Sequence, residues 1–134
     1  MRWWVDDEIV QSGFVKVGHM RRMCLYESNK NHYVVTSGWH GKYCVSNITL
    51  GVIVSRGVVS RDALINDMAV VHSGGEVIVA MATDQREVQL WNVIHNRELR
   101  TISTTEGRVG RLAAVDDVLV IGHDSGITVH RIIV

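Results

Sequence analysis

The chain has 134 residues, of which 46% are apolar, and its 14 basic and 14 acidic residues cancel at neutral pH. That apolar fraction, rich in valine and isoleucine, excludes a disordered chain and predicts a folded β-rich domain. The balanced charge excludes the basic excess behind nonspecific binding to nucleic acid or acidic membranes, so nucleic acid is not supported as a partner.

The amino-terminal end lacks the sustained apolar core of a secretory signal peptide, and no stretch approaches the roughly 18 to 20 apolar residues that cross a bilayer. We therefore expect a soluble intracellular protein, cytoplasmic with the nucleus as an alternative, and no membrane partner. Cys24 and Cys44 each lie in an apolar strand pattern, which favours buried thiols over a disulfide.

Alternation of apolar and polar residues, rather than helical spacing, runs along the chain and predicts strands throughout. Two strands come first, at 3–5 and 9–17. Four follow at 20–26, 33–37, 43–46 and 48–54, and a connection at 55–63 leads to four more at 64–71, 77–82, 88–91 and 99–102. The last unit has three strands and lacks a fourth; they are at 109–115, 118–121 and 127–131.

A repeat organises these strands. Asp84 to Trp91 combines a polar turn that holds an aspartate with an alternating strand, and a weaker copy runs from Asp124 to His130. An earlier copy has His40 at the aspartate position. The equivalent strand ends, at spacings of 42, 45 and 39 residues, are Trp4, Ser46, Trp91 and His130. A unit of about 40 to 45 residues made wholly of strands predicts propeller blades.

These residues resemble the WD-repeat β-propeller family, whose blade contains a Gly-His pair, two strands, an aspartate turn, a third strand ending in Trp-Asp, and a fourth strand. The best-matching stretch, 65–102, ends its third strand in Trp91-Asn92, and Gly18-His19 supplies the other signature one unit earlier. No single unit carries all the family's signatures. In that family, the corresponding turn and network positions are structural, which implies such roles for His19, Asp84, Trp91 and Asp124.

The resemblance implies an all-β fold, a WD-repeat-like propeller segment of about three four-stranded antiparallel blades. The whole chain, 1–134, would be one partial propeller domain. Its blades would occupy approximately 19–54, 64–102 and 107–131, with end strands in 1–17.

No catalytic motif emerges from the sequence. The run His123-Asp124-Ser125 contains the residue types of a hydrolase triad, but three consecutive residues in a tight turn point in different directions. Cys24, His40 and Cys44 are zinc-ligand types, yet a second closely spaced pair is missing. We therefore predict a protein that is not an enzyme and that has no metal or other cofactor.

The resemblance also implies that partner proteins dock on one rim of the propeller. The positions that match this rim are Trp39, Thr83 and His123 beside the turns, and Arg21, Asn66 and Arg108 at the starts of the first strands. Tryptophan and arginine dominate binding hot spots because they combine large area with specific polar geometry. Trp39 is the most suggestive because it lies in a polar turn, and its packing against a neighbouring blade is the alternative.

We therefore expect a scaffold for protein–protein interactions, as a segment within a larger propeller or a multi-subunit assembly. Three blades cannot close a ring, so the remaining blades of a longer propeller, or a second copy joined head to tail through 9–17, would cover the open ends. One alternative is a ligand-binding or enzymatic propeller whose central channel uses Arg21 or Arg22, Asn66, Asp67 and Arg111. The other is a β-sandwich binding module, in which the repeat spacing is accidental.

Overall fold

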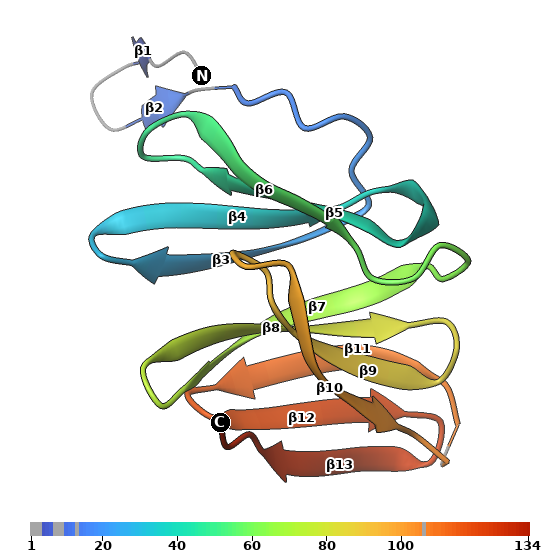
Figure 1. The fold of residues 1–134 in the computed structure, drawn as a ribbon. Helices are drawn as coiled ribbons and strands as arrows, with labels where there is room; N and C mark the ends of the chain where they lie inside the picture. Colours follow the sequence, from blue (N-terminus) through green and yellow to red (C-terminus); the bar gives the residue numbers. More distant parts are fainter. Residues whose placement is uncertain (1–3, 7–9, 13, 106) are drawn as a thin grey trace.

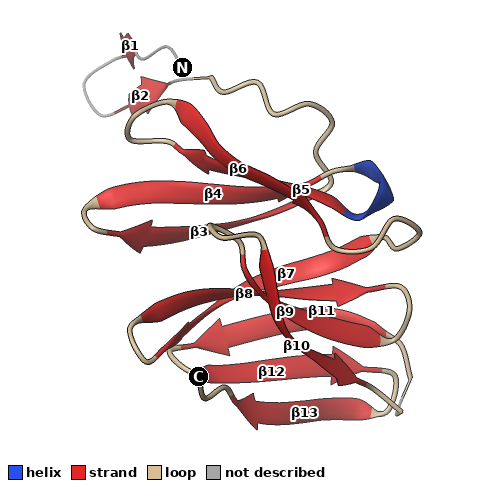
Figure 2. Cartoon of the chain, in the orientation of Figure 1, coloured by secondary structure: helices blue, strands red, loops and turns tan. Residues whose placement is uncertain are grey.

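The computed structural model describes residues 4–6, 10–12, 14–105 and 107–134. This part of the chain is all β apart from a short 3₁₀ turn, η1 (Trp39–Gly41), which confirms the predicted fold class (Figures 1 and 2). A small antiparallel hairpin pairs β1 (Trp4–Asp6) with β2 (Val10–Ser12). Within the described residues, no helix is long and apolar enough to cross a membrane.

Three antiparallel sheets follow the hairpin, and the strands of each pair in chain order. The first sheet contains β3 (Arg22–Ser28), β4 (Asn31–Ser37), β5 (Lys42–Asn47) and β6 (Val52–Val58). The middle sheet contains β7 (Ile65–Ser73), β8 (Glu76–Thr83), β9 (Glu87–Asn92) and β10 (Arg97–Ser103). The last sheet has three described strands, β11 (Val109–Val115), β12 (Val118–His123) and β13 (Gly126–Arg131). The sheets follow one another down the view in Figure 1.

The sheets meet most closely along their first strands. The Arg22 Nε donates a hydrogen bond of 2.9 Å to the Asn66 carbonyl oxygen, which joins β3 to β7. The Leu112 N–H donates a hydrogen bond of 2.7 Å to the Asp67 carboxylate, which joins β11 to β7. Three successive sheets connected through their first strands have the radial order of propeller blades. The β-sandwich alternative, with two sheets, is therefore wrong.

Two apolar layers fill the spaces between the sheets. One layer, between the first and middle sheets, contains Tyr26, Val35, Tyr43, Val45, Ile65, Met68, Val79, Met81, Trp91 and Val93. The other, between the middle and last sheets, is built around Val71, Ile78, Ala80, Val88, Leu90, Leu119 and Ile121. The middle sheet is therefore covered on both faces. This explains why residues 78–83 of β8 are all buried, where a strand covered on one face would alternate.

The predicted strand at 48–54 is wrong in its bounds, because residues 48–51 form a turn and β6 begins at Val52 and continues to Val58. Side-chain hydrogen bonds hold that turn. The Asn47 Oδ1 accepts the Leu50 N–H at 3.0 Å, and the Thr49 hydroxyl accepts the His32 N–H at 2.9 Å. Consequently the predicted connection at 55–63 is shorter than expected.

The predicted strand at 9–17 is also wrong, since β2 covers only Val10–Ser12 and residues 14–17 are not in a strand. Residues 9 and 13 lie outside the described residues. Elsewhere the strands of the middle and last sheets match the predicted ranges within about two residues.

Candidate functional site

Strand pairing aligns the three sheets residue by residue. Ser46, Trp91 and His130 take equivalent positions in their third strands, as the repeat predicted, because each faces the equivalent residue of the second strand. Trp4 lies in β1, but the placement of its side chain is outside the described part of the chain.

The turn between the second and third strands differs from the prediction. The last paired residue of the second strand is Gly38 in the first sheet, Thr83 in the middle sheet and His123 in the last sheet. The residues that follow them are Trp39, Asp84 and Asp124. Trp39, rather than His40, therefore takes the aspartate position in the first sheet. The predicted position is wrong by one residue, because Gly38 pairs with Lys42 at the end of the ladder and Trp39 is the first residue of the turn.

In the middle and last sheets the turn aspartate is bonded to the residue just before the first strand. The Asp84 carboxylate accepts the Leu64 N–H at 3.0 Å, and the Asp124 carboxylate accepts the Arg108 N–H at 3.1 Å. Each hydrogen bond connects the start of the first strand to the turn that follows the second strand. By the same register, His19 stands in the first sheet where Leu64 stands in the middle sheet.

A ring stack replaces that hydrogen bond in the first sheet. The His19 and Trp39 rings lie 4.6 Å apart, centroid to centroid, with an angle of 11° between their planes. The Arg21 guanidinium carbon lies 5.1 Å from the centroid of the Trp39 ring, within cation–π range. Trp39 is nevertheless 48% exposed. We call these three residues the Trp39 cluster.

The backbone of η1 fixes the orientation of this tryptophan. His40 and Gly41 both have positive φ, 58° and 68°. A Cβ on Gly41 would lie 2.0 Å from the Ser60 carbonyl oxygen, so only glycine fits between η1 and the following connection. The Gly41 carbonyl accepts the Val59 N–H at 2.8 Å, which holds the two segments together.

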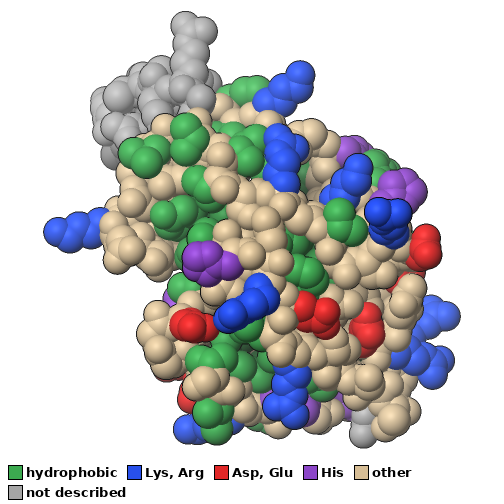
Figure 3. Space-filling model, in the orientation of Figure 1, with side chains coloured by type: hydrophobic (Ala, Val, Ile, Leu, Met, Phe, Trp, Pro, Cys, Tyr) green, Lys and Arg blue, Asp and Glu red, His purple; other side chains and the backbone are tan. Residues whose placement is uncertain are grey.

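A cavity of about 500 Å³ lies beside the Trp39 cluster. We call it the Trp39 cavity. Its walls come from the segment before β3, from η1, and from the ends of β4, β5 and β6; they are Val17, His19, Thr36, Gly38, Trp39, Lys42, Tyr43, Cys44, Arg56, Gly57 and Val58. None of the described residues that line it is an aspartate or a glutamate. Figure 3 shows lysine, arginine and histidine side chains gathered on the side of the molecule where η1 lies.

The cations of this region have no carboxylate partners among the described residues. The two ion pairs in that part of the chain are His32–Glu27 and Arg131–Asp117, at 3.5 and 3.9 Å. The Arg21 Nε is buried and has no hydrogen-bond partner in the described part of the chain, where the guanidinium contacts the ring of Trp39. A buried hydrogen-bond donor without a partner is uncommon in proteins, which makes this arginine a candidate for binding a ligand.

The other residues predicted for the rim do not join the Trp39 cluster. Thr83 is fully buried, and its hydroxyl accepts the Gln85 N–H at 3.2 Å, so it offers no surface to a partner. The His123 Nε2 lies 2.8 Å from the Thr128 hydroxyl, within its own sheet. Arg108 is exposed beside the Asp124 turn. Asn66 is linked through its carbonyl oxygen to Arg22.

Two cations beside the cavity, Lys42 and Arg56, were missed by the sequence reasoning. They lie on neighbouring strands, and the pairing of Lys42 with Val58 and of Cys44 with Arg56 puts both on the same face of the first sheet. Sequence spacing alone could not reveal this, because it depends on the register of β5 against β6.

Trp91 is buried between the first and middle sheets. Its Nε1 donates to the Gln89 Oε1 at 2.9 Å, and the Gln89 Nε2 donates to the Glu87 Oε1 at 2.8 Å. These three residues form a polar ladder along one face of β9. The Trp91 ring also meets Tyr43 edge to face at 5.8 Å between centroids.

The central-channel alternative is not supported by the arrangement of the first strands. The two carboxylate oxygens of Asp67 accept the N–H groups of Met68 and Leu112, at 2.9 and 2.7 Å. The first bond lies within β7 and the second joins β7 to β11, so both oxygens serve the backbone rather than a ligand. Burial, with a smaller contribution from Asp67, raises the pKa of Cys24 to about 12, which keeps its thiol protonated. Among the described residues, no group of three or more His, Cys, Asp or Glu could hold a metal ion.

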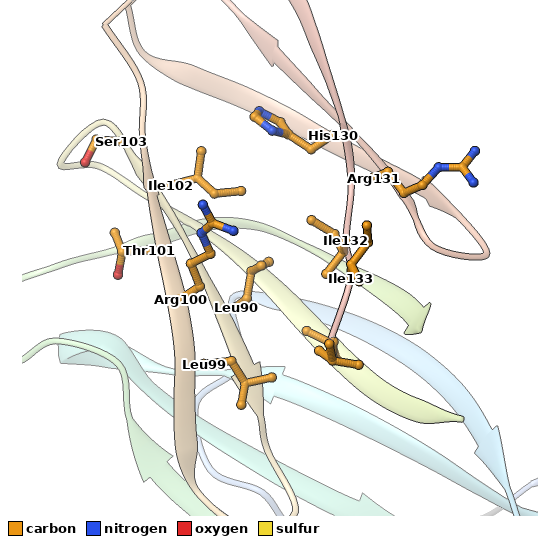
Figure 4. A pocket seen from close by; sticks show the side chains of 12 residues that line it. Leu90, Leu99, Arg100, Thr101, Ile102, Ser103, His130, Arg131, Ile132 and Ile133 are labelled. Carbon is orange, nitrogen blue, oxygen red and sulfur yellow. The ribbon is translucent and has the colours of Figure 1, made fainter. Parts of the chain in front are cut away.

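A second cavity, of about 540 Å³, lies between β10 and the end of β13 (Figure 4). The first and middle sheets each have a fourth strand beyond their third, whereas the last sheet ends at β13 among the described residues. Side chains of Leu90, Leu99 and Ile102 from the middle sheet line the cavity on one side, opposite Ile132 and Ile133.

No family model and no curated protein sequence matches the chain. Solved structures do match. Saccharomyces cerevisiae Sqt1 matches over 84% of this chain and 32% of its own, with a TM-score of 0.68 and 18% identity. The WD40 repeats of RRP9 match over 85% and 34%, with a TM-score of 0.66 and 19% identity. A chain of the mitotic checkpoint complex matches over 98% and 42%, with a TM-score of 0.73 and 14% identity.

The chain thus spans between 32% and 42% of the length of these matched chains. At these identities the likeness concerns the fold, and it agrees with the radial order of the sheets. The chain has the fold of a partial WD40 β-propeller, in which the first, middle and last sheets correspond to successive blades.

Proposed function

We propose that this partial propeller is a non-enzymatic scaffold for protein–protein interactions, acting within a larger propeller or a multi-subunit assembly. The observation that carries the proposal is the Trp39 cluster. A tryptophan that stacks on a histidine, lies within cation–π range of an arginine and is half exposed beside a cavity has the composition and preorganisation of a binding hot spot.

The solved structures add support at the level of the fold. Two of the matched chains come from assemblies, the mitotic checkpoint complex and Polycomb Repressive Complex 2 of Chaetomium thermophilum. The second matches over 89% of this chain with a TM-score of 0.71 and 11% identity. We also propose that the protein is cytoplasmic. Both of its cysteines are free thiols, which agrees with a reducing compartment.

The test is affinity capture from a cell extract with the wild-type chain and Trp39→Ala in parallel. A matched control is Leu50→Ala, since Leu50 is 67% exposed at the opposite end of the first sheet. Proteins that bind the rim should be lost with Trp39→Ala and retained with Leu50→Ala. Equal capture by all three chains would show that the Trp39 cluster is not the docking surface.

A second surface favours association through the open last sheet. Its outer face exposes Val115, Ile127 and Val129, at 73%, 70% and 59%. Corresponding faces of the first and middle sheets are packed against a neighbouring sheet, so we propose that a further blade, from a longer propeller or from a second copy, covers this face. The solution mass of the isolated chain tests this proposal.

A further inference from the structure

We infer that the Trp39 cavity binds an acidic peptide segment, with carboxylates on its basic residues and an apolar side chain against the Trp39 ring. This inference rests on the proposed docking role of the Trp39 cluster, and it adds the chemistry of the partner. Three features of the described residues carry it: the placement of the cations, the composition of the cavity walls, and the charge of the chain as a whole.

The cations come from separate parts of the first sheet. Lys42 begins β5 and Arg56 lies in β6, and both line the Trp39 cavity. Arg21 precedes β3 and contacts the ring of Trp39 beside the cavity. Lys42 and Arg56 are diagonal neighbours on one face, a relation that puts side chains about 7–8 Å apart in an antiparallel pair. That spacing allows a single acidic segment to meet both.

These cations are available to a ligand. Arg21, Lys42 and Arg56 form no ion pair with any residue that the structure describes. The Nε atom of Arg21 is buried without a hydrogen-bond partner among the described residues. The two terminal nitrogens of the guanidinium make no hydrogen bond to these residues either. Guanidinium binds carboxylate through paired N–H donors, and such charge-assisted hydrogen bonds are stronger than neutral ones.

The walls of the cavity favour a peptide over a purely ionic ligand. Val17, Val58 and the exposed part of Trp39 offer apolar surface, and the Thr36 hydroxyl lies nearby. Since Trp39 already stacks on His19, it is fixed before any ligand arrives, and little conformational entropy is lost on binding. An aliphatic side chain next to a glutamate or aspartate would use both the apolar and the basic parts.

The charge of the whole chain argues against a nucleic acid as the occupant. The 14 basic residues are balanced by 14 acidic ones, so the cationic region is local and not part of a broad basic surface. Nucleic-acid sites track a long phosphate backbone with many cations and several stacking rings. The Trp39 cavity offers a short site whose exposed rings, among its described lining residues, are the stacked pair Trp39 and His19.

Fluorescence anisotropy on the whole chain tests the inference directly. One probe is a fluorescein-labelled peptide of glutamate, aspartate, leucine and glycine. The control probe is the same peptide with glutamine and asparagine in place of the acidic residues. The acidic peptide should bind more tightly, and its affinity should fall about tenfold between low and moderately high salt, as screening predicts. Equal affinity for the amide peptide would overturn the inference. So would tighter binding of a labelled single-stranded oligonucleotide, which would identify a nucleic-acid site.

Matched variants locate the binding. The double variant Arg21→Gln/Arg56→Gln should weaken the acidic peptide about tenfold. Lys30→Gln/Arg97→Gln removes the same charge at the opposite end of the sheets and should change affinity less than about twofold. Equal losses in both double variants would show a nonspecific charge effect and refute the site.

The two proposals can fail separately in the capture experiment. If Trp39→Ala loses its captured proteins while Arg21→Gln/Arg56→Gln keeps them, the rim is a docking surface but its partner is not acidic. If the peptide binds as expected while Trp39→Ala captures the same proteins as the wild type, the cavity binds acidic peptides, and the scaffold role lies on another surface.

Discussion

Trp39 and Asp84 occupy the same position in successive sheets, yet they hold their turns by different means. Asp84 accepts the Leu64 N–H through its carboxylate, whereas Trp39 stacks on His19, which stands at the position of Leu64. The stack keeps the beginning of the first strand next to the turn, as the hydrogen bond does. It also leaves half of a large aromatic ring in solvent, which a carboxylate would not.

Replacing Trp39 by Ala should therefore cost little stability. A stacked aromatic pair at an exposed site contributes about 0.5–1.5 kcal/mol, so the free energy of unfolding should fall by about 1 kcal/mol. Denaturant titration measures this value, and a double-mutant cycle with His19→Ala isolates the stacking contribution. A loss above about 3 kcal/mol would show that Trp39 is chiefly a core residue.

Replacing Trp91 by Ala should be far more damaging. Trp91 is 8% exposed, contacts Tyr43 and donates to Gln89, so the variant leaves a cavity and an unpaired buried amide. Truncation of a large buried aromatic costs about 3–5 kcal/mol. Urea unfolding of Trp91→Ala and Trp39→Ala under the same conditions makes the comparison, and a loss below about 1 kcal/mol at Trp91 would contradict the buried role.

The two turn aspartates should contribute similarly to stability. Asp84→Ala and Asp124→Ala each remove the acceptor of a backbone N–H, which predicts a loss of about 1–3 kcal/mol. Asp84→Asn keeps an acceptor oxygen and should recover part of the loss. Asp62→Ala is the control, because Asp62 is exposed and accepts no such bond from the described residues. Asp116 is unsuitable, since its φ is 53° and alanine would add backbone strain. Equal, negligible changes in the free energy of unfolding at Asp84, Asp124 and Asp62 would show that the hydrogen bonds of the two turns do not stabilise the protein.

Much of this fold could be predicted from the sequence, because alternation and turn residues specify most strands locally. The turn at 48–51 could not, since its apolar Ile48 and Leu50 continue the strand pattern while Asn47 and Thr49 hold the turn through side-chain hydrogen bonds. The candidate site was predictable only in part. Trp39 and Arg21 were identified, but their association with Lys42 and Arg56 depends on the register of β5 against β6, which residue spacing does not record.

Alkaline pH should destabilise the protein. Burial raises the pKa of Cys24 from 9.0 to about 12, and burial raises those of Tyr26 and Tyr43 from 10.0 to about 12. Between about pH 9 and 12 the unfolded chain therefore releases protons that the folded chain keeps, so the free energy of unfolding falls as pH rises. Urea titrations at pH 8, 9, 10 and 10.5 should show this decline, with a shallower slope for Cys24→Ala. A constant free energy over that range would contradict it.

The open face of the last sheet should make the isolated chain associate. Val115, Ile127 and Val129 lie on one face of the sheet, and their neighbours on the opposite face are packed against the middle sheet, so water contacts an apolar surface of the kind that another sheet normally covers. Light scattering at rising concentration should give a mass above the 15.0 kDa of one chain. Val129→Asp puts a charge on this face and should restore the mass of one chain without lowering the unfolding temperature. Ile94→Asp, which adds the same charge at a 43% exposed position in a turn of the middle sheet, should leave association unchanged. A wild-type chain that stays monomeric and unfolds cooperatively at all concentrations would show that this face needs no covering blade.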